Sequence, residues 1–249
     1  MKKIGMLVAV EMDAVLRRYG TAERREKRSG FEIHVYDMGA YELYAIRSGA
    51  GEISAAAATQ MLIDRFEVEL VVNFGVVGGL TEEMAQTKTC VVERVVHYDY
   101  DTTAYDHCLL GQYMGYPDEY LRPTPALVER ATAICPELKR VTDASADKFI
   151  EGREAKSALH ERWGADICEM EAAAVGQKGV NSKKIFPERV FSPFFYTREG
   201  FFAQIRSIIY FRTGVRLNSD DRTNPPAFPL FSAVPDKNAC LGTAHGLRH

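Results

Sequence analysis

The chain has 249 residues, of which 46% are hydrophobic and 26% charged, and its formal net charge is −3. This composition fits a globular protein, and it offers neither a basic stripe for nucleic acid nor the apolar run of about 20 residues that a membrane span needs. The start, Met1–Ile4, does not lead into a secretory signal, so a cytoplasmic location is expected. The five scattered cysteines predict reduced thiols rather than disulfides or a metal site.

The first third of the chain alternates buried strands with helices. A continuous apolar run at 4–10 predicts a strand that is buried on both faces. A helix is expected to begin where this run meets the acidic residues Glu11 and Asp13. Alternating residues at 31–36 and 41–46 flank a short glycine-containing turn, which predicts a hairpin.

The same alternation continues through the middle of the chain. An alanine-rich helix is expected over 53–66, and buried strands are expected at 70–74 and 90–96. A further helix is expected over 125–135. Strands that alternate with helices in this way predict the α/β class with a central sheet.

The composition changes near Val175. Up to this residue the chain has 29 acidic and 20 basic residues, and after it there are 5 acidic and 11 basic residues. Nine of the 13 phenylalanines and six of the ten prolines lie in the second part. We therefore expect an incomplete α/β domain over 1–175 and an atypical, irregular tail over 176–249, in which 200–212 alone has a helical pattern. Two interpretations remain open: a genuine tail that wraps another surface, or a sequence that left its reading frame near Val175.

Two carboxylates close together are the most informative local feature. Glu169 and Glu171 flank Met170, after an apolar approach and before a run of alanines. Burial of an unpaired carboxylate costs several kcal/mol, so such a pair is a poor way to build a core. A ligand with hydroxyl groups, or a cationic transition state, would explain both side chains.

A second acidic pair lies at the end of the first expected strand. Open α/β sheets bind ligands at the carboxyl ends of their strands, so Glu11 and Asp13 are candidate site residues. The first turn of a helix also favours acidic residues, which gives a purely structural explanation. The glycines in Ser48–Gly51 and in Gly75–Gly79 would let the backbone approach a ligand closely, although many α/β turns are rich in glycine.

The segment His97–His107 mixes histidine, aspartate and tyrosine. If the strand continued, His97, Asp99 and Asp101 would share one face and could form a metal site. The interleaved tyrosines favour a binding loop or a subunit contact instead. No metal and no cofactor are therefore expected.

Taken together, the motifs resemble the nucleoside phosphorylase superfamily, and within it the 5′-methylthioadenosine/S-adenosylhomocysteine nucleosidases. From Met1 to about Val175 the resemblance rests on Ala-Val-x-x-acid after the first strand, Ser-Gly-x-Gly, Asn-x-Gly-x-x-Gly-Gly-Leu, Phe-Ile-x-Gly and Glu-Met-Glu-Ala. It implies a three-layer α/β/α sandwich with a central mixed sheet, and a homodimer. It also implies a nucleosidase that hydrolyses the N-glycosidic bond of methylthioadenosine or adenosylhomocysteine to adenine and a thio-ribose.

The resemblance also implies roles for individual residues. Glu171 would hold the ribose hydroxyls, with Met170 against the ribose and Glu169 beside it. Phe149 and Ile150 would frame the purine. Val76, Val77 and Gly78 would form the loop beside the sugar. Tyr105 would contribute to the site of the neighbouring subunit.

The sequence departs from the family pattern at two points. The glutamate that activates water in the family falls at Asp13, one methylene shorter, and Glu11 is the possible substitute. The family also carries an aspartate in a Ser-Asp motif that protonates N7 of the purine. No apolar strand with this motif follows Val175, and Ser219–Asp220 is a weak candidate. We therefore expect this chain to be impaired.

Other functions remain as alternatives. A purine nucleoside phosphorylase would need cationic side chains on its phosphate, but the loop at Gly75 carries no arginine, and Arg47 stands beside Ser48. A non-catalytic nucleoside-binding protein would suit a genuine tail, and a structural module without a ligand is a further alternative.

Overall fold

A computed structural model describes residues 1–84, 89–181, 190–191 and 204–212 of the chain. The strands are β1 (Lys2–Val8), β2 (Arg24–Arg28), β3 (Phe31–Asp37), β4 (Tyr41–Arg47), β5 (Leu70–Gly79), β6 (Cys90–His97), β7 (Tyr120–Leu121), β8 (Lys139–Ser145), β9 (Ile167–Glu169), β10 (Val190–Phe191) and β11 (Gln204–Arg212). The helices are α1 (Met12–Tyr19), α2 (Glu52–Arg65), α3 (Thr103–Asp106), α4 (Pro125–Ile134), α5 (Arg153–Trp163) and α6 (Ala172–Asn181), with a 3₁₀ turn at Glu82–Met84.

The strands form one mixed sheet of 11 strands, in the order β2-β3-β4-β1-β5-β9-β8-β6-β7, with β11 beside β5 and β10 beside β11. Strand β1 lies between β4 and β5 and is parallel to both. Strands β6, β8 and β9 are also parallel to their neighbours in that group. Strand β9 runs antiparallel to β5, with Cys168 opposite Gly78, so the carboxyl ends of β1 and β9 approach each other beside the second half of β5.

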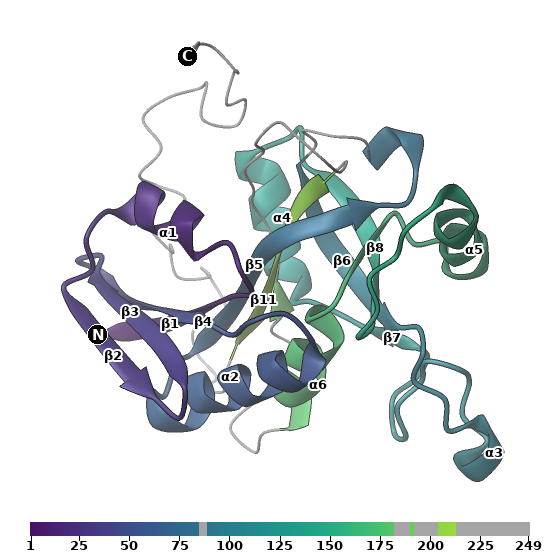
Figure 1. The fold of residues 1–249 in the computed structure, drawn as a ribbon, viewed down its shortest axis with the longest axis horizontal. Coiled ribbons are helices and arrows are strands. Elements are labelled where there is room, and N and C mark those ends of the chain that lie inside the picture. Colours follow the sequence, from purple (N-terminus) through teal and green to yellow (C-terminus); the bar gives the residue numbers. More distant parts are fainter. Residues whose placement is uncertain (85–88, 182–189, 192–203, 213–249) are drawn as a thin grey trace, which may run out of the picture.

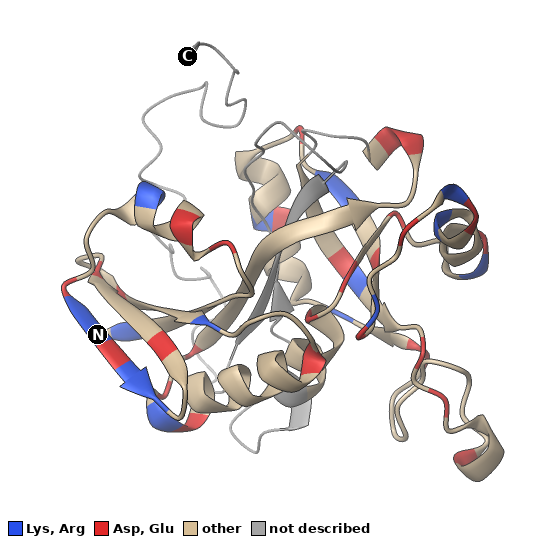
Figure 2. Cartoon of the chain, in the orientation of Figure 1, with Lys and Arg blue, Asp and Glu red and all other residues tan. Residues whose placement is uncertain are grey.

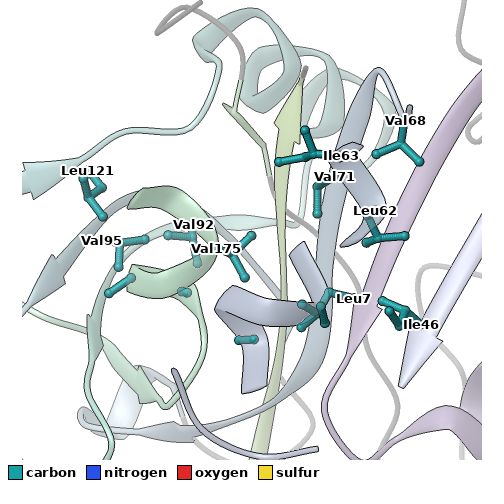
Figure 3. Close-up of a cluster of buried hydrophobic side chains, with 14 of the residues drawn as sticks. Leu7, Ile46, Leu62, Ile63, Val68, Val71, Val92, Val95, Leu121 and Val175 are labelled. Atoms are coloured by element: carbon teal, nitrogen blue, oxygen red, sulfur yellow. The ribbon is translucent and has the colours of Figure 1, made fainter. Parts of the chain in front are cut away.

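Helices cover both faces of the sheet (Figure 1). Leu7 of β1 packs into a core shared with α2 and α6, which is drawn in Figure 3. The next residues on either side, Met6 and Val8, pack instead into a core shared with α1 and α4. Because both faces of β1 are buried, its sequence is a continuous apolar run. The prediction of a three-layer α/β/α sandwich with a mixed sheet is confirmed.

A smaller third core holds α5 against β6 and β8. Leu159 and Trp163 of α5 pack with Val96 and Ala144 of the two strands. The Tyr120 hydroxyl donates a hydrogen bond to the Trp163 carbonyl at 3.1 Å. Trp163 is the single tryptophan of the chain. This core fixes the helix that follows the predicted purine-framing residues.

The sheet edge formed by β2 is strongly charged. Its sequence is RREKR, and Figure 2 shows the basic residues on this outer strand. Strands β3 and β4 separate it from β1. Charges on an edge strand discourage pairing with other chains, so these residues have a structural explanation and do not form part of the site.

Between β6 and β7 the chain extends as an arm, residues 98–119, with α3 near its tip (Figure 1). The rings of Tyr100 and Tyr113 hold the base of the arm together, with centroids 4.3 Å apart. Further out, three large apolar side chains are exposed: Tyr105, Leu109 and Met114. The arm therefore presents apolar surface away from the three cores.

The sequence predicted most elements of residues 1–135 within a few positions. The helix expected over 200–212 is wrong, because Gln204–Arg212 form β11, antiparallel to β5 from Gly78 to Leu70. The segment QIRSIIYFR is rich in β-branched and aromatic residues, and β5 offers it an open edge to pair with. Helix α6 continues across Val175, where the composition changes. Asp220 lies outside the described residues, and the division into two segments stays a prediction.

Candidate functional site

A cavity of about 510 Å³ opens at the carboxyl ends of β1 and β9, beside Val76, Val77 and Gly78 of β5. The loop after β8 and the start of α5 close its other side. Open α/β sheets bind ligands at the carboxyl ends of their strands. The cavity brings together nine of the predicted site residues: Glu11, Val76, Val77, Gly78, Phe149, Ile150, Glu169, Met170 and Glu171.

Glu11 lies between the ends of two strands. One carboxylate oxygen, Oε1, accepts a hydrogen bond from the N–H of Val76 at 3.1 Å, and Oε2 accepts one from the N–H of Val10 at 3.1 Å. The first bond links β1 to β5, 65 residues further along the chain. Two backbone donors therefore fix the orientation of this carboxylate in the cavity.

Asp13 is placed differently from Glu11, although two positions separate them. It lies in the first turn of α1, where its side chain is exposed and does not line the cavity. Helix α1 turns away from the strand ends immediately after Glu11, which is its N-cap residue. Of the two carboxylates that the sequence offered as the water-activating base, Glu11 is the one in the cavity.

Glu171 is buried and held by a backbone donor. Its Oε1 accepts a hydrogen bond from the N–H of Gly51 at 2.7 Å. Burial raises the pKa of Glu171 to about 7; the Gly51 bond opposes this rise, and the negative charge of Glu11 adds to it. The carboxylates of Glu11 and Glu171 are therefore close enough for their negative charges to repel each other.

Gly51 cannot be replaced without disturbing this arrangement. Its φ of +99° lies in the region that favours glycine. A Cβ atom here would lie 2.8 Å from Oδ1 of Asp147, which itself accepts the N–H of Glu52 at 2.6 Å. The glycines of Ser48–Gly51 therefore allow the close backbone approach that the sequence indicated. The group that the backbone approaches is the carboxylate of Glu171 and not a ligand.

Glu169 has a different role from Glu171. Its Oε2 accepts the N–H groups of Glu171 and Ala172 at 2.9 and 2.8 Å, and its Oε1 also lies 3.0 Å from the N–H of Ala172. These are donors at the start of α6, which have no partner within the helix. Burial, together with the nearby carboxyl of Asp143, raises the pKa of Glu169. Glu169 therefore caps a helix at the cavity wall.

The opposite wall of the cavity is apolar and partly open. The Phe149 side chain is 66% exposed, while Ile150 packs on the third core. Met170 and Val77 complete this surface, and the cations Lys148 and Lys156 line it as well. An exposed aromatic ring beside aliphatic side chains fits a flat aromatic ligand.

Other predicted residues lie away from the cavity. Tyr105 is 84% exposed on α3 of the arm and does not line the cavity of its own chain. Arg47 is exposed and does not line the cavity. Among the described residues, no three histidine, cysteine, aspartate or glutamate side chains are grouped so that they could hold a metal ion. No helix of the described part is long and apolar enough to cross a membrane.

Sequence reasoning missed one buried acid near the site. Asp143 of β8 is fully buried, and neither of its carboxyl oxygens has a hydrogen-bond partner among the described residues. Burial raises its pKa well above the ordinary value, and the charge of Glu171 raises it further. The strand pattern around Asp143 gave no signal, because a carboxyl two residues before a strand end usually lies in solvent.

The cavity lies within a segment that matches a known family. A model of the phosphorylase superfamily matches residues 3–178 of this chain. The chain belongs to the phosphorylase superfamily. Within the superfamily, the 5′-methylthioadenosine/S-adenosylhomocysteine nucleosidase of Hydrogenovibrio crunogenus is 31% identical over 182 residues, which are 70% of this chain and 78% of the relative. The nucleosidase of Geobacillus thermodenitrificans is 30% identical over 183 residues, with 70% and 76% covered.

Solved structures of the superfamily agree with this placement. The Helicobacter pylori nucleosidase with butyl-thio-DADMe-Immucillin-A gives a TM-score of 0.66 at 27% identity, covering 72% of this chain and 78% of that chain. A futalosine hydrolase mutant from the same organism gives 0.65 at 26% identity, covering 72% and 83%. The resemblance inferred from the motifs is thus confirmed, since the family model matches and the relatives are named as nucleosidases.

Proposed function

We propose that this chain hydrolyses the N-glycosidic bond of 5′-methylthioadenosine or S-adenosylhomocysteine, giving adenine and the thio-ribose. The observation that carries the proposal is the pair of carboxylates in one cavity, Glu11 and Glu171, each held by backbone N–H groups. The named relatives, which are nucleosidases for these two substrates, support it.

The two carboxylates suit the two needs of the reaction. The bond breaks through an oxocarbenium-like transition state, which requires negative charge beside the sugar and a base for the incoming water. We assign the first role to Glu171, whose carboxylate would accept the ribose hydroxyls. We assign the second to Glu11, because Val10 and Val76 fix its orientation. Phe149 and Ile150 would frame the purine, with Met170 against the ribose.

We further propose that turnover is slow compared with the relatives. Departure of the purine is assisted by protonation, and general acid catalysis typically contributes about 10²- to 10⁴-fold. No apolar strand with a Ser-Asp motif follows Val175 in the sequence, and Asp220 is the weak remaining candidate. A kcat/KM equal to that of the Helicobacter pylori enzyme, assayed side by side, would overturn the proposed impairment.

We also propose a homodimer formed through the arm. Tyr105, Leu109 and Met114 expose apolar surface there, and Tyr105 would complete the cavity of the partner. An apolar patch of this kind on a projecting segment is typical of an interaction site.

The test is release of adenine from methylthioadenosine in phosphate-free buffer. We expect Glu11→Gln to lower kcat/KM at least about 100-fold, because the variant cannot accept a proton from water. Asp13→Asn is the matched control, and it should change kcat/KM by less than about twofold, since Asp13 lies outside the cavity.

Three results would contradict the proposal. Strict dependence on phosphate would indicate a phosphorylase. Saturable binding without turnover would indicate a nucleoside-binding protein. No thermal shift with adenine or methylthioadenosine would indicate a module without this ligand. Equal loss in the Asp13 and Glu11 variants would reject the assignment of the base.

A further inference from the structure

A second set of polar side chains lies behind Glu171, outside the cavity. Glu52, the first residue of α2, follows directly on Gly51, whose N–H binds Glu171. Oε2 of Glu52 lies 3.0 Å from Nε2 of His97, at the end of β6, and the two side chains are only 15% and 14% exposed. A buried ion pair therefore adjoins the backbone donor of the site.

His97 also contacts the arm. Its Nδ1 lies 2.6 Å from the Tyr113 hydroxyl, and its Nε2 lies 3.0 Å from Oδ1 of Asp99. The ring of Tyr100 stacks on the imidazole with centroids 5.6 Å apart. Burial opposes the charged form of His97, but the carboxylates of Glu52 and Asp99 outweigh burial and raise its pKa.

Glu52 is tied to the other elements that place Glu171. The Ser145 hydroxyl, at the end of β8, lies 3.5 Å from Oε1 of Glu52 and accepts the N–H of Ala173 in α6 at 2.9 Å. The N–H of Glu52 donates to Asp147 at 2.6 Å. Ser145, Asp147 and His97 thus hold the start of α2, and His97 supplies a charge of opposite sign to that of Glu52.

We infer that His97 is a positioning residue, which acts through Glu52 to fix the Gly51 amide and thereby to aim Glu171 at the ribose. The inference rests on the proposed function for the role of Glu171. His97 does not line the cavity, so it has no direct contact with a substrate there. Without the imidazole, Glu52 would keep a buried carboxylate with weaker partners, and the turn at Gly51 would loosen.

The first test measures hydrogen exchange of the Gly51 amide in the full chain without any substrate. We expect His97→Ala to speed this exchange about tenfold and His97→Gln, which retains a hydrogen-bond donor, to speed it less. His34→Ala is the matched control, because His34 is also buried beside a glutamate, Glu32 at 3.1 Å, but lies on β3. Unchanged exchange at Gly51, or an equal increase in the His34 variant, would overturn the inference.

The second test compares two substrates. For methylthioadenosine, we expect His97→Gln to raise KM about tenfold while kcat changes less than about threefold. For the 2′,3′-dideoxy analogue, which has no hydroxyls for Glu171, KM should change less than about twofold. Equal losses on both substrates would show a general structural defect and would overturn the inference.

The two tests separate the inference from the function on which it rests. If the wild-type chain releases no adenine, the proposed function fails, while the exchange of the Gly51 amide still decides whether His97 fixes that turn. If adenine is released and the exchange rate does not respond to His97, the function stands and the positioning role fails.

Discussion

A carboxylate with a pKa near neutrality gives the site a defined response to pH. The pKa of Glu171 is raised to about 7, mainly by burial. Its ionised form is the one that would stabilise a cationic sugar, so kcat/KM is expected to rise as pH increases through about 7. Measurement of adenine release from about pH 5.5 to about pH 8.5 should show this acid limb. A flat profile over this range would contradict the assignment of Glu171.

The variant Glu171→Gln provides the control for this limb. The glutamine cannot ionise, so the pH profile of the variant should lack the inflection near pH 7. Above that pH, its kcat/KM should be at least about 100-fold below that of the wild-type chain. An inflection that persists in the variant would belong to another group.

The buried carboxyl of Asp143 is expected to lower stability. Both of its oxygens lack a partner among the described residues, and the adjacent inward-facing residue, Val141, is apolar. Asp143→Val should therefore raise the free energy of unfolding by about 1–3 kcal/mol, measured by urea denaturation at pH 7. A loss of stability in this variant would show that the carboxyl has a partner that compensates its burial.

The same residue predicts a pH dependence of stability. The folded pKa of Asp143 is raised above its unfolded value of 3.8, so the unfolded chain releases a proton that the folded chain retains. Its contribution to stability therefore falls as pH rises from about 4 toward the folded pKa. Asp143→Asn should remove this part of the decrease in the free energy of unfolding. An unchanged slope of that free energy against pH, between about pH 4 and pH 7, would contradict the expectation.

At the scale of elements, α6 depends on its cap. Glu169 accepts the N–H groups of Glu171 and Ala172, which are donors at the start of the helix. Glu169→Ala should lower the free energy of unfolding by about 1–2 kcal/mol, whereas Glu169→Gln keeps an acceptor and should cost less. Denaturant unfolding of both variants measures the difference, and equal costs would contradict a capping role.

Elements in which one pattern dominates could be predicted from the sequence. The run at 4–10 and the hairpin at 31–46 have clear periodicity, and the structure places β1, β3 and β4 there. Strand β11 could not be predicted, because its pairing partner, β5, is more than 100 residues away. The β-branched and aromatic residues of this segment favour a strand, but the edge that stabilises the strand is distant in the sequence.

For the site, the sequence identified residue types but not which of two neighbours faces the cavity. The family pattern placed the base at Asp13, with Glu11 as the substitute, whereas the start of α1 leaves Glu11 in the cavity and Asp13 outside it. The contact of Gly51 with Glu171 spans 120 residues, so spacing alone could not reveal it. His97 drew attention as a metal candidate, and its position beside Glu52 depends on how β6 and α2 meet.

At the scale of the whole molecule, the arm predicts how the chain assembles. We expect a homodimer in sedimentation equilibrium, and Tyr105→Asn should raise its dissociation constant at least about tenfold, because large aromatic residues dominate such contacts. Ile134→Asn on α4 is the matched control, since Ile134 is also an exposed apolar residue but lies away from the arm. A monomeric wild-type chain would contradict the proposed dimer.

The single tryptophan gives this molecule a natural optical probe. All indole fluorescence arises from Trp163, which is buried at the end of α5 and lies 5.2 Å from the Arg162 guanidinium. Helix α5 begins directly after the loop that carries Phe149 and Ile150. A red shift of the emission therefore reports detachment of α5, the support of the purine wall. If the emission shifts at a lower denaturant concentration than the circular dichroism of the whole chain, this wall opens before the rest of the chain unfolds.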